Sequence, residues 1–156
     1  MLLRVQALVC DVERAARIGR FVGKLSIPSE ILDKPGPLDE REWEFIRHQT
    51  LIGERIIRTS PQLWGVAAIV RATHENWDGT GYPDGLVGEE IPLASRTICA
   101  CDAYYAMTSD RPYRPALSVD EALNELMRLA GTQFDPTVVR VLVAHVRDEL
   151  QAEHAA

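Results

Sequence analysis

Cysteine, lysine and long apolar runs are scarce in this sequence of 156 residues. The cysteines, Cys10, Cys99 and Cys101, are odd in number and include no C-x-x-C pair, which argues against a disulfide framework and against a cysteine zinc site. We therefore expect a reducing, cytoplasmic setting. Arg4 interrupts the apolar opening and Asp11 follows it, so the opening is too short for a membrane span and poorly built for export.

An excess of positive charge is lacking as well. The formal net charge of −6 argues against nucleic acid as the main partner, because that binding draws on a basic surface. Internal repeats and long period-two alternation are absent, so the sequence predicts neither a repeat array nor a sheet. A single domain of this length buries about two-thirds of the surface that its unfolded chain exposes. We expect one all-α domain over residues 1–150 and a frayed tail over residues 151–156.

Helix signals are what the sequence does contain. Apolar residues at helical spacing predict an amphipathic helix from residue 4 to about residue 22. Asp39 and Glu42 stand at capping-box spacing and predict a helix that reaches about Thr59. Further helices are predicted from start signals and one apolar run: Ser60 with Pro61 to about His74, Ala94–Thr108, Ser118 with Glu121, and Asp135 with Pro136.

The periodicity also predicts which side chains face inward. Phe45, His48 and Ile52 recur at steps of three and four residues, so this stripe, including His48, is expected on the core side of its helix. Trp43 and Trp64 are assigned to the core because of the large apolar surface that each would bury.

The stretch H-E-N-W-D-G-T-G-Y-P-D at His74–Asp84 cannot continue a helix. Gly79 and Gly81 admit positive φ, and Pro83 lacks an N–H group. Long ordered loops between helices are uncommon unless they form a site, so this segment predicts a shaped, functional loop. A surface turn of chance composition is the alternative. A related string, S-D-R-P-Y-R, follows at Ser109–Arg114.

Together with I-P-L-A-S-R, these strings resemble the signature of the HD-GYP family, a branch of the metal-dependent HD phosphohydrolases associated with cyclic di-GMP. The resemblance runs from about Ile18 to about Val139. It implies an all-α helical bundle of the HD type with a long ordered GYP loop. It also implies hydrolysis of a phosphodiester, in which metal ions neutralise the phosphate and lower the pKa of a bridging water.

The same resemblance assigns roles to individual residues. His48, His74 and Asp102 fall on metal-ligand positions of the family, and Lys24 matches the lysine after its H-D pair, which makes Lys24 the one candidate catalytic residue. The positions that would contact cyclic di-GMP are Lys24, Tyr82, Arg111 and Arg114. The alternatives are that the two arginines lie on an ordinary surface, and that Trp77 and Tyr82 pack under the loop instead of stacking on a guanine.

Four positions depart from the family pattern. Arg20 and Phe21 stand where the family has its defining histidine and bridging aspartate, Thr73 replaces a histidine, and Tyr105 replaces an aspartate. Residues 1–19, which we interpret as an atypical first helix, contain no histidine. An inward-pointing Arg20 would stay protonated and repel a cation, although it would attract a phosphate.

These departures lead to several alternatives. We expect no bound metal, with His48 as a hydrogen-bonded core histidine and Asp102 paired with a neighbouring arginine. The alternative is one weakly held iron or manganese on His48, His74 and Asp102. The predicted function is a degenerate HD-GYP domain that binds cyclic di-GMP, or a signalling protein such as a diguanylate cyclase, with little or no hydrolysis. The other two interpretations are an active phosphodiesterase with a reduced metal site, and a truncated product with little function.

Overall fold

The computed structural model describes residues 28–154 except residues 33, 35 and 111–114. This part of the chain is helical and contains no strand, apart from an isolated bridge between Ala130 and Phe134. The all-α prediction is therefore confirmed. No helix in the described ranges is both long enough and apolar enough to cross a membrane. The helical elements are α2 (Ser29–Leu32), α3 (Glu40–Ile57), η1 (Pro61–Leu63), α4 (Trp64–Arg71), η2 (Gly88–Glu90), α5 (Leu93–Thr108), α6 (Val119–Arg128) and α7 (Pro136–His154).

The two helix starts that depend on a capping box occur where the sequence predicts them. Asp39 caps α3 by accepting from the backbone N–H groups of Arg41 and Glu42, both at 2.9 Å, while Glu42 accepts from the Asp39 backbone at 2.8 Å. Ser118 and Glu121 form the same reciprocal pair at the start of α6. Each box satisfies backbone donors that a helix start would otherwise leave unpaired.

Both ends of α4 differ from the prediction. The Ser60 hydroxyl donates to the Gln62 side chain at 2.8 Å and caps no backbone group, so the chain enters α4 through the short 3-10 turn η1. Helix α4 then ends at Arg71, before His74. At the C-terminal end of the described residues, α7 continues to His154, and the fraying of residues 151–156 stays a prediction.

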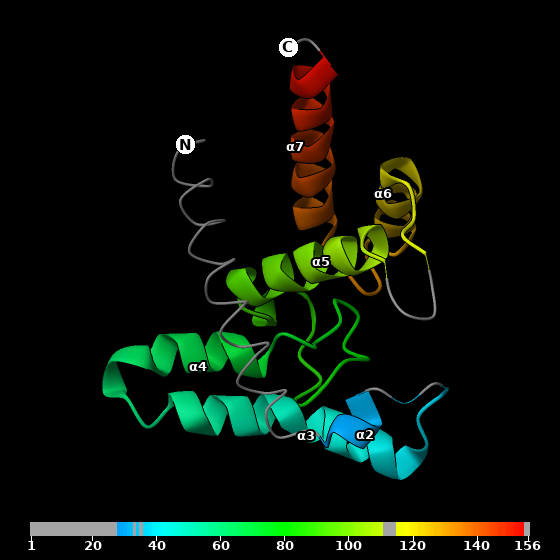
Figure 1. Cartoon of the computed structure of the whole chain (residues 1–156). Coiled ribbons are helices and arrows are strands. Elements are labelled where there is room, and N and C mark those ends of the chain that lie inside the picture. The colour runs from blue at the N-terminus through cyan, green and yellow to red at the C-terminus, as the bar shows by residue number, and fades with distance from the viewer. Residues whose placement is uncertain (1–27, 33, 35, 111–114, 155–156) are drawn as a thin grey trace.

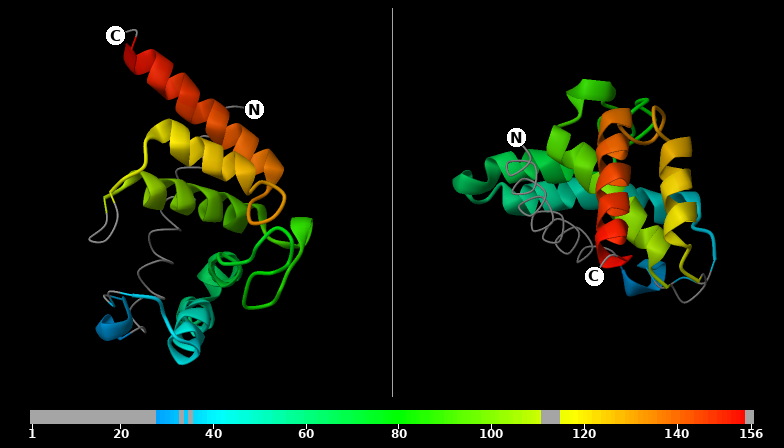
Figure 2. Two further views of the ribbon diagram at one scale, coloured as in Figure 1. Left: turned by 90° about the vertical axis from the view of Figure 1, so that its right-hand side faces the viewer. Right: turned by 90° about the horizontal axis from the view of Figure 1, so that it is seen from above.

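The helices form two groups. Helices α3 and α4 lie side by side, and α5, α6 and α7 stack on one another as a second group (Figures 1 and 2). A small cluster in the first group contains Ile57, Ala67 and Val70. The larger core lies in the second group and is formed by Ala100, Leu123, Leu126, Phe134, Val138, Val139, Val143 and Val146. The last helix, α7, thus contributes Val138, Val139, Val143 and Val146 to this core.

The predicted inward face of α3 is wrong. Phe45 is 53% exposed and His48 is exposed, whereas the buried residues of α3 are Gln49, Thr50, Gly53 and Ile57. The buried stripe is therefore rotated by about one residue, or roughly 100°, from the prediction. The packing partner contributes to this rotation, because α3 lies against α4 and Ile57 shares a cluster with Ala67 and Val70 of α4.

The two tryptophans assigned to the core are also exposed. Trp43 is 40% exposed on α3, and Trp64 is 57% exposed at the start of α4. The Trp64 indole N–H donates to the Arg58 carbonyl at 3.1 Å, which fixes the ring across the turn between α3 and α4. An aromatic side chain can satisfy its polar atom in this way without entering a core.

Candidate functional site

The loop of residues 72–92 connects α4 to α5 and contains the HENWDGTGYPD stretch, followed by the short turn η2 (Figure 1). Gly79 has φ of +84°, which L side chains rarely adopt. Gly81 is required for a different reason: a Cβ atom there would lie 2.2 Å from the backbone nitrogen of Asn76. The prediction of a shaped loop is confirmed, but at Gly81 a close backbone approach, and not a positive φ, demands glycine.

Glu75 fixes the second half of this loop. Its side chain is buried, with the residue 2% exposed. One carboxylate oxygen accepts from the backbone N–H groups of Asp84 and Gly85 at 2.7 and 3.2 Å, and the other accepts from Leu86 at 3.2 Å. Hydrogen bonds to a charged acceptor are stronger than neutral ones, so a single side chain holds three consecutive residues in place.

Arg71 connects the loop to both helices of the first group. From the end of α4 it donates to the two carboxylate oxygens of Asp84 at 2.6 and 2.7 Å, and to Glu54 of α3 at 2.6 Å. The hydrogen bond from Arg71 lowers the pKa of Asp84 below its ordinary value. The planar guanidinium suits such a two-oxygen contact, which sets both the position and the orientation of Asp84.

The first half of the loop is held by the second group of helices. The backbone N–H groups of Trp77 and Asp78 donate to the carbonyls of Gln133 and Thr132, at 3.1 and 2.9 Å, in the connection between α6 and α7. Nearby, Arg96 of α5 lies 5.7 Å from the Trp77 ring and pairs with the buried Asp135 at 2.6 Å. The loop therefore makes contacts with both helical groups.

His74, Tyr82 and Gln49 come together where the loop returns to α3. The rings of His74 and Tyr82 stack with centroids 5.2 Å apart and planes 7° from parallel. The side-chain nitrogen of Gln49 lies 3.4 Å from Nε2 of His74, and the Tyr82 backbone N–H donates to the His74 carbonyl at 3.1 Å. Burial raises the pKa of the Tyr82 phenol, and a hydrogen bond with Gln49 opposes this shift.

Comparison with known proteins agrees with the motif and the fold. A model of the HD domain family matches residues 9–138. The chain is 38% identical over 140 residues to a cyclic di-GMP phosphodiesterase of Thermotoga maritima, an alignment that covers 88% of this chain and 38% of the relative. The chain belongs to the HD domain family, in its HD-GYP branch. It is also 40% identical over 134 residues to the cyclic di-GMP phosphodiesterase response regulator RpfG of Xanthomonas campestris pv. campestris, covering 85% of this chain and 35% of RpfG.

A solved structure shows the same fold. The crystal structure of a cyclic GMP-AMP-specific phosphodiesterase of Vibrio cholerae aligns with a TM-score of 0.57 at 24% identity, covering 80% of this chain and 33% of that one. This HD-GYP chain thus spans between about one-third and two-fifths of the length of the relatives described.

The described residues of this HD-GYP domain do not assemble the metal centre that the family implies. His48 is exposed and its Nδ1 atom lies 2.8 Å from the Glu44 carbonyl, while His74 stacks on Tyr82. Asp102 is half-buried on α5. Within the described ranges, no three His, Cys, Asp or Glu side chains form a group that could hold a metal ion. The fold brings His74 and Tyr82 together. It does not bring His48, His74 and Asp102 together as a set of metal ligands among the described residues.

The other predicted positions fall into two classes. Thr73 donates to the Val70 carbonyl at 2.9 Å, and Tyr105 is 63% exposed. Neither side chain supplies the imidazole or the carboxylate that the family has at these positions. The remaining predicted site residues lie outside the described part of the chain: Arg20, Phe21, Lys24, Arg111 and Arg114.

Three residues that shape the loop were not predicted. Glu75 lies inside the motif itself, and a carboxylate followed by two glycines and a proline was a signal that loop N–H groups need an acceptor. Arg71 and Gln49 offer no comparable signal. Their partners Asp84 and His74 are 13 and 25 residues away along the chain, and only the fold brings them together.

Proposed function

We propose that this chain is a degenerate HD-GYP domain of cyclic di-GMP signalling. It binds cyclic di-GMP, or a signalling protein such as a diguanylate cyclase, through the surface of its GYP loop, and it hydrolyses the nucleotide little or not at all. The relatives of the chain support the nucleotide as the ligand, since several of them are cyclic di-GMP phosphodiesterases. The cytoplasm is the proposed location, because cyclic di-GMP signalling proteins with reduced cysteines act there.

The observation that supports the proposal is a loop of fixed shape that lies beside an incomplete set of metal-ligating side chains. Glu75 and Arg71 hold the loop from two sides, and the Tyr82 ring is fixed against His74. Such a loop presents its backbone and aromatic groups without an ordering cost on binding. Hydrolysis needs metal ions that activate water, and Arg20 and Phe21 occupy the positions of the family's H-D pair.

The second candidate function is a cyclic di-GMP phosphodiesterase with a reduced metal site. The names of the relatives favour it, as does the retention of His74 in the motif. It requires one iron or manganese on His48, His74 and Asp102, and His48 would have to leave its contact with the Glu44 carbonyl to take part.

Calorimetric titration with cyclic di-GMP tests the proposal. If Arg111 and Arg114 contact the phosphates, replacing either by alanine should weaken binding about tenfold or more, which corresponds to roughly 1.5–3 kcal/mol for a hydrogen bond to a charged group. Arg55→Ala is the matched control, because Arg55 is an exposed arginine on α3. Equal affinity in all variants would place the ligand elsewhere, and absence of binding at high micromolar nucleotide would leave only the protein-partner version.

Hydrolysis is measured in parallel with manganese or iron supplied. We expect negligible turnover, because a missing bridging carboxylate removes several kcal/mol of barrier lowering. Metal analysis of the purified protein should find substoichiometric iron and manganese. Metal-stimulated turnover that disappears in His74→Ala would support the phosphodiesterase instead.

A further inference from the structure

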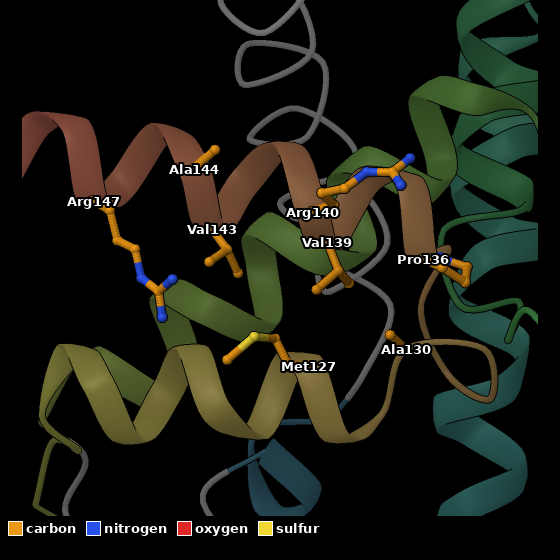
Figure 3. A pocket seen from close by; sticks show the side chains of 8 residues that line it. All are labelled: Met127, Ala130, Pro136, Val139, Arg140, Val143, Ala144 and Arg147. Atoms are coloured by element: carbon orange, nitrogen blue, oxygen red, sulfur yellow. The ribbon is translucent and has the colours of Figure 1, made fainter.

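A groove lies between α6 and α7, and no residue of the GYP loop lines it (Figure 3). Its volume is about 410 Å³. Its lining includes Met127 of α6 and Val139 and Val143 of α7, and Met127 is 42% exposed there. The lining also contains two arginines, Arg140 and Arg147, and no carboxylate. The groove therefore combines an apolar floor with positive charge, on a chain whose formal net charge is −6.

The two arginines mark different ends of the groove. Arg147 extends toward α6, whereas Arg140 lies back along α7 toward Pro136, where its guanidinium is 3.4 Å from the Thr137 hydroxyl (Figure 3). Seven residues separate them, which is about 10 Å along a helix. In the described ranges neither guanidinium pairs with a carboxylate, unlike Arg96 and Arg128.

This arrangement selects among possible occupants. Because the two side chains extend in different directions, an occupant should carry two negative groups at least roughly 10 Å apart, with apolar groups between them to cover Met127 and Val143. A fatty acid has one carboxylate, so it can pair with only one of the two arginines. An amphipathic helix with acidic residues about two turns apart satisfies both ends, and its apolar residues at intervening helical positions meet the floor.

The chain's own first segment is a poor match. Residues 1–22 carry four arginines, Arg4, Arg14, Arg17 and Arg20, against two carboxylates, Asp11 and Glu13. Their net charge is therefore about +2, and like charges would meet at the groove.

We infer that the groove between α6 and α7 is a docking site for an acidic amphipathic helix of a partner protein. The site is separate from the nucleotide or partner surface proposed for the GYP loop. Arg140 and Arg147 bind the carboxylates of the incoming helix, while Met127, Val139 and Val143 cover its apolar face.

The probe for this site is a fluorescein-labelled synthetic helix of about 15 residues, with leucines on one face and glutamates about seven residues apart. A second peptide replaces each glutamate by lysine. We expect the 156-residue chain to bind the acidic peptide in fluorescence anisotropy and to bind the basic peptide at least tenfold more weakly. Affinity for the acidic peptide should fall as salt is added.

Charge reversal locates the contact. The double variant Arg140→Glu, Arg147→Glu should lose at least tenfold in affinity for the acidic peptide and should gain affinity for the basic one. Arg55→Glu is the control, since Arg55 is exposed on α3 and does not line the groove. Met127→Ser should weaken binding several-fold without changing the charge. Circular dichroism confirms that each variant folds.

Three results would overturn the inference. The first is that the acidic peptide does not bind. The second is that the wild type and the double arginine variant bind it equally, and the third is that dodecanoate binds at the groove while the peptide does not. Recovery of binding when the charges of both partners are exchanged would support it, because a lost fold cannot produce a gain for the basic peptide.

Discussion

Arg71 holds Asp84 through two hydrogen bonds, from Nε to Oδ2 at 2.6 Å and from Nη2 to Oδ1 at 2.7 Å. The same guanidinium reaches Glu54 with its third nitrogen. One side chain therefore connects α3, the end of α4 and the GYP loop. The Arg71 and Asp84 side chains are each about a third exposed, so solvent screens part of this attraction.

Asp84→Asn should destabilise the protein by about 1 kcal/mol at neutral pH, because the neutral amide loses the charge-assisted pair with Arg71. The native pKa of Asp84 is lowered, so its stabilising contribution is present above the unfolded pKa and is lost as pH falls through the native one. In urea unfolding, the difference between wild type and variant should shrink below about pH 4. A constant difference from pH 7 to pH 3 would contradict this.

Glu75→Gln should cost about 2 kcal/mol, because glutamine keeps one oxygen acceptor and turns an N–H₂ group toward a loop N–H donor. For a domain of this size the melting temperature should fall by roughly 5 °C. Glu89→Gln is the control, since Glu89 is exposed in the same loop, and it should melt like the wild type. Scanning calorimetry measures both. An unchanged melting temperature for Glu75→Gln would mean that the loop does not need its buried acceptor.

Gly81→Ala and Gly65→Ala should shift stability in opposite directions. A Cβ on residue 81 would meet Glu75 and Asn76 backbone atoms at 2.2–2.6 Å, so the loop must move. A Cβ on Gly65 in α4 meets nothing within 4 Å, and alanine there should stabilise the helix by about 0.5–1 kcal/mol. Hydrogen exchange should show lost protection of the loop amides in the first variant alone. Intact loop protection in Gly81→Ala would show that the close approach is dispensable.

Cys99 should react slowly with iodoacetamide at pH 8. Burial raises the pKa of its thiol to about 12, and the neighbouring Asp102 acts in the same direction. Because the thiolate is the nucleophile, its labelling should be at least about a hundredfold slower than that of an ordinary thiol. Mass spectrometry of a tryptic digest gives the rate, and urea-unfolded protein is the control. Labelling of native Cys99 at the unfolded rate would show that this thiol is accessible and ordinary.

The features that the sequence predicted correctly depend on neighbours a few residues apart. The capping boxes at Asp39 and Ser118 need only the glutamate three residues later, so spacing is enough to find them. The glycines and the proline likewise exclude a helix at the GYP loop, whatever surrounds it.

The errors share a different cause, which is that packing partners are not encoded locally. The side of α3 that faces inward depends on where α4 lies, and periodicity alone placed it one residue away, at His48 instead of Gln49. Trp64 was assigned to the core from its size, but its N–H group bonds across a turn that the sequence did not specify. Similarly, the 13-residue separation between Arg71 and Asp84 conceals a pair that only the folded loop creates.

The GYP loop touches one group of helices through Arg71 and Asp84, and the other through Trp77, Asp78 and the connection between α6 and α7. Each group contains its own apolar cluster, and among the described residues the α3–α4 cluster is the smaller one. A small cluster alone gains too little free energy to remain ordered. The loop adds to the direct contact between α4 and α5, in which the Ser95 hydroxyl donates to the Ile69 carbonyl at 2.8 Å. Removing the loop's hydrogen bonds to both groups should therefore broaden or split the single calorimetric transition, with α3 and α4 melting first.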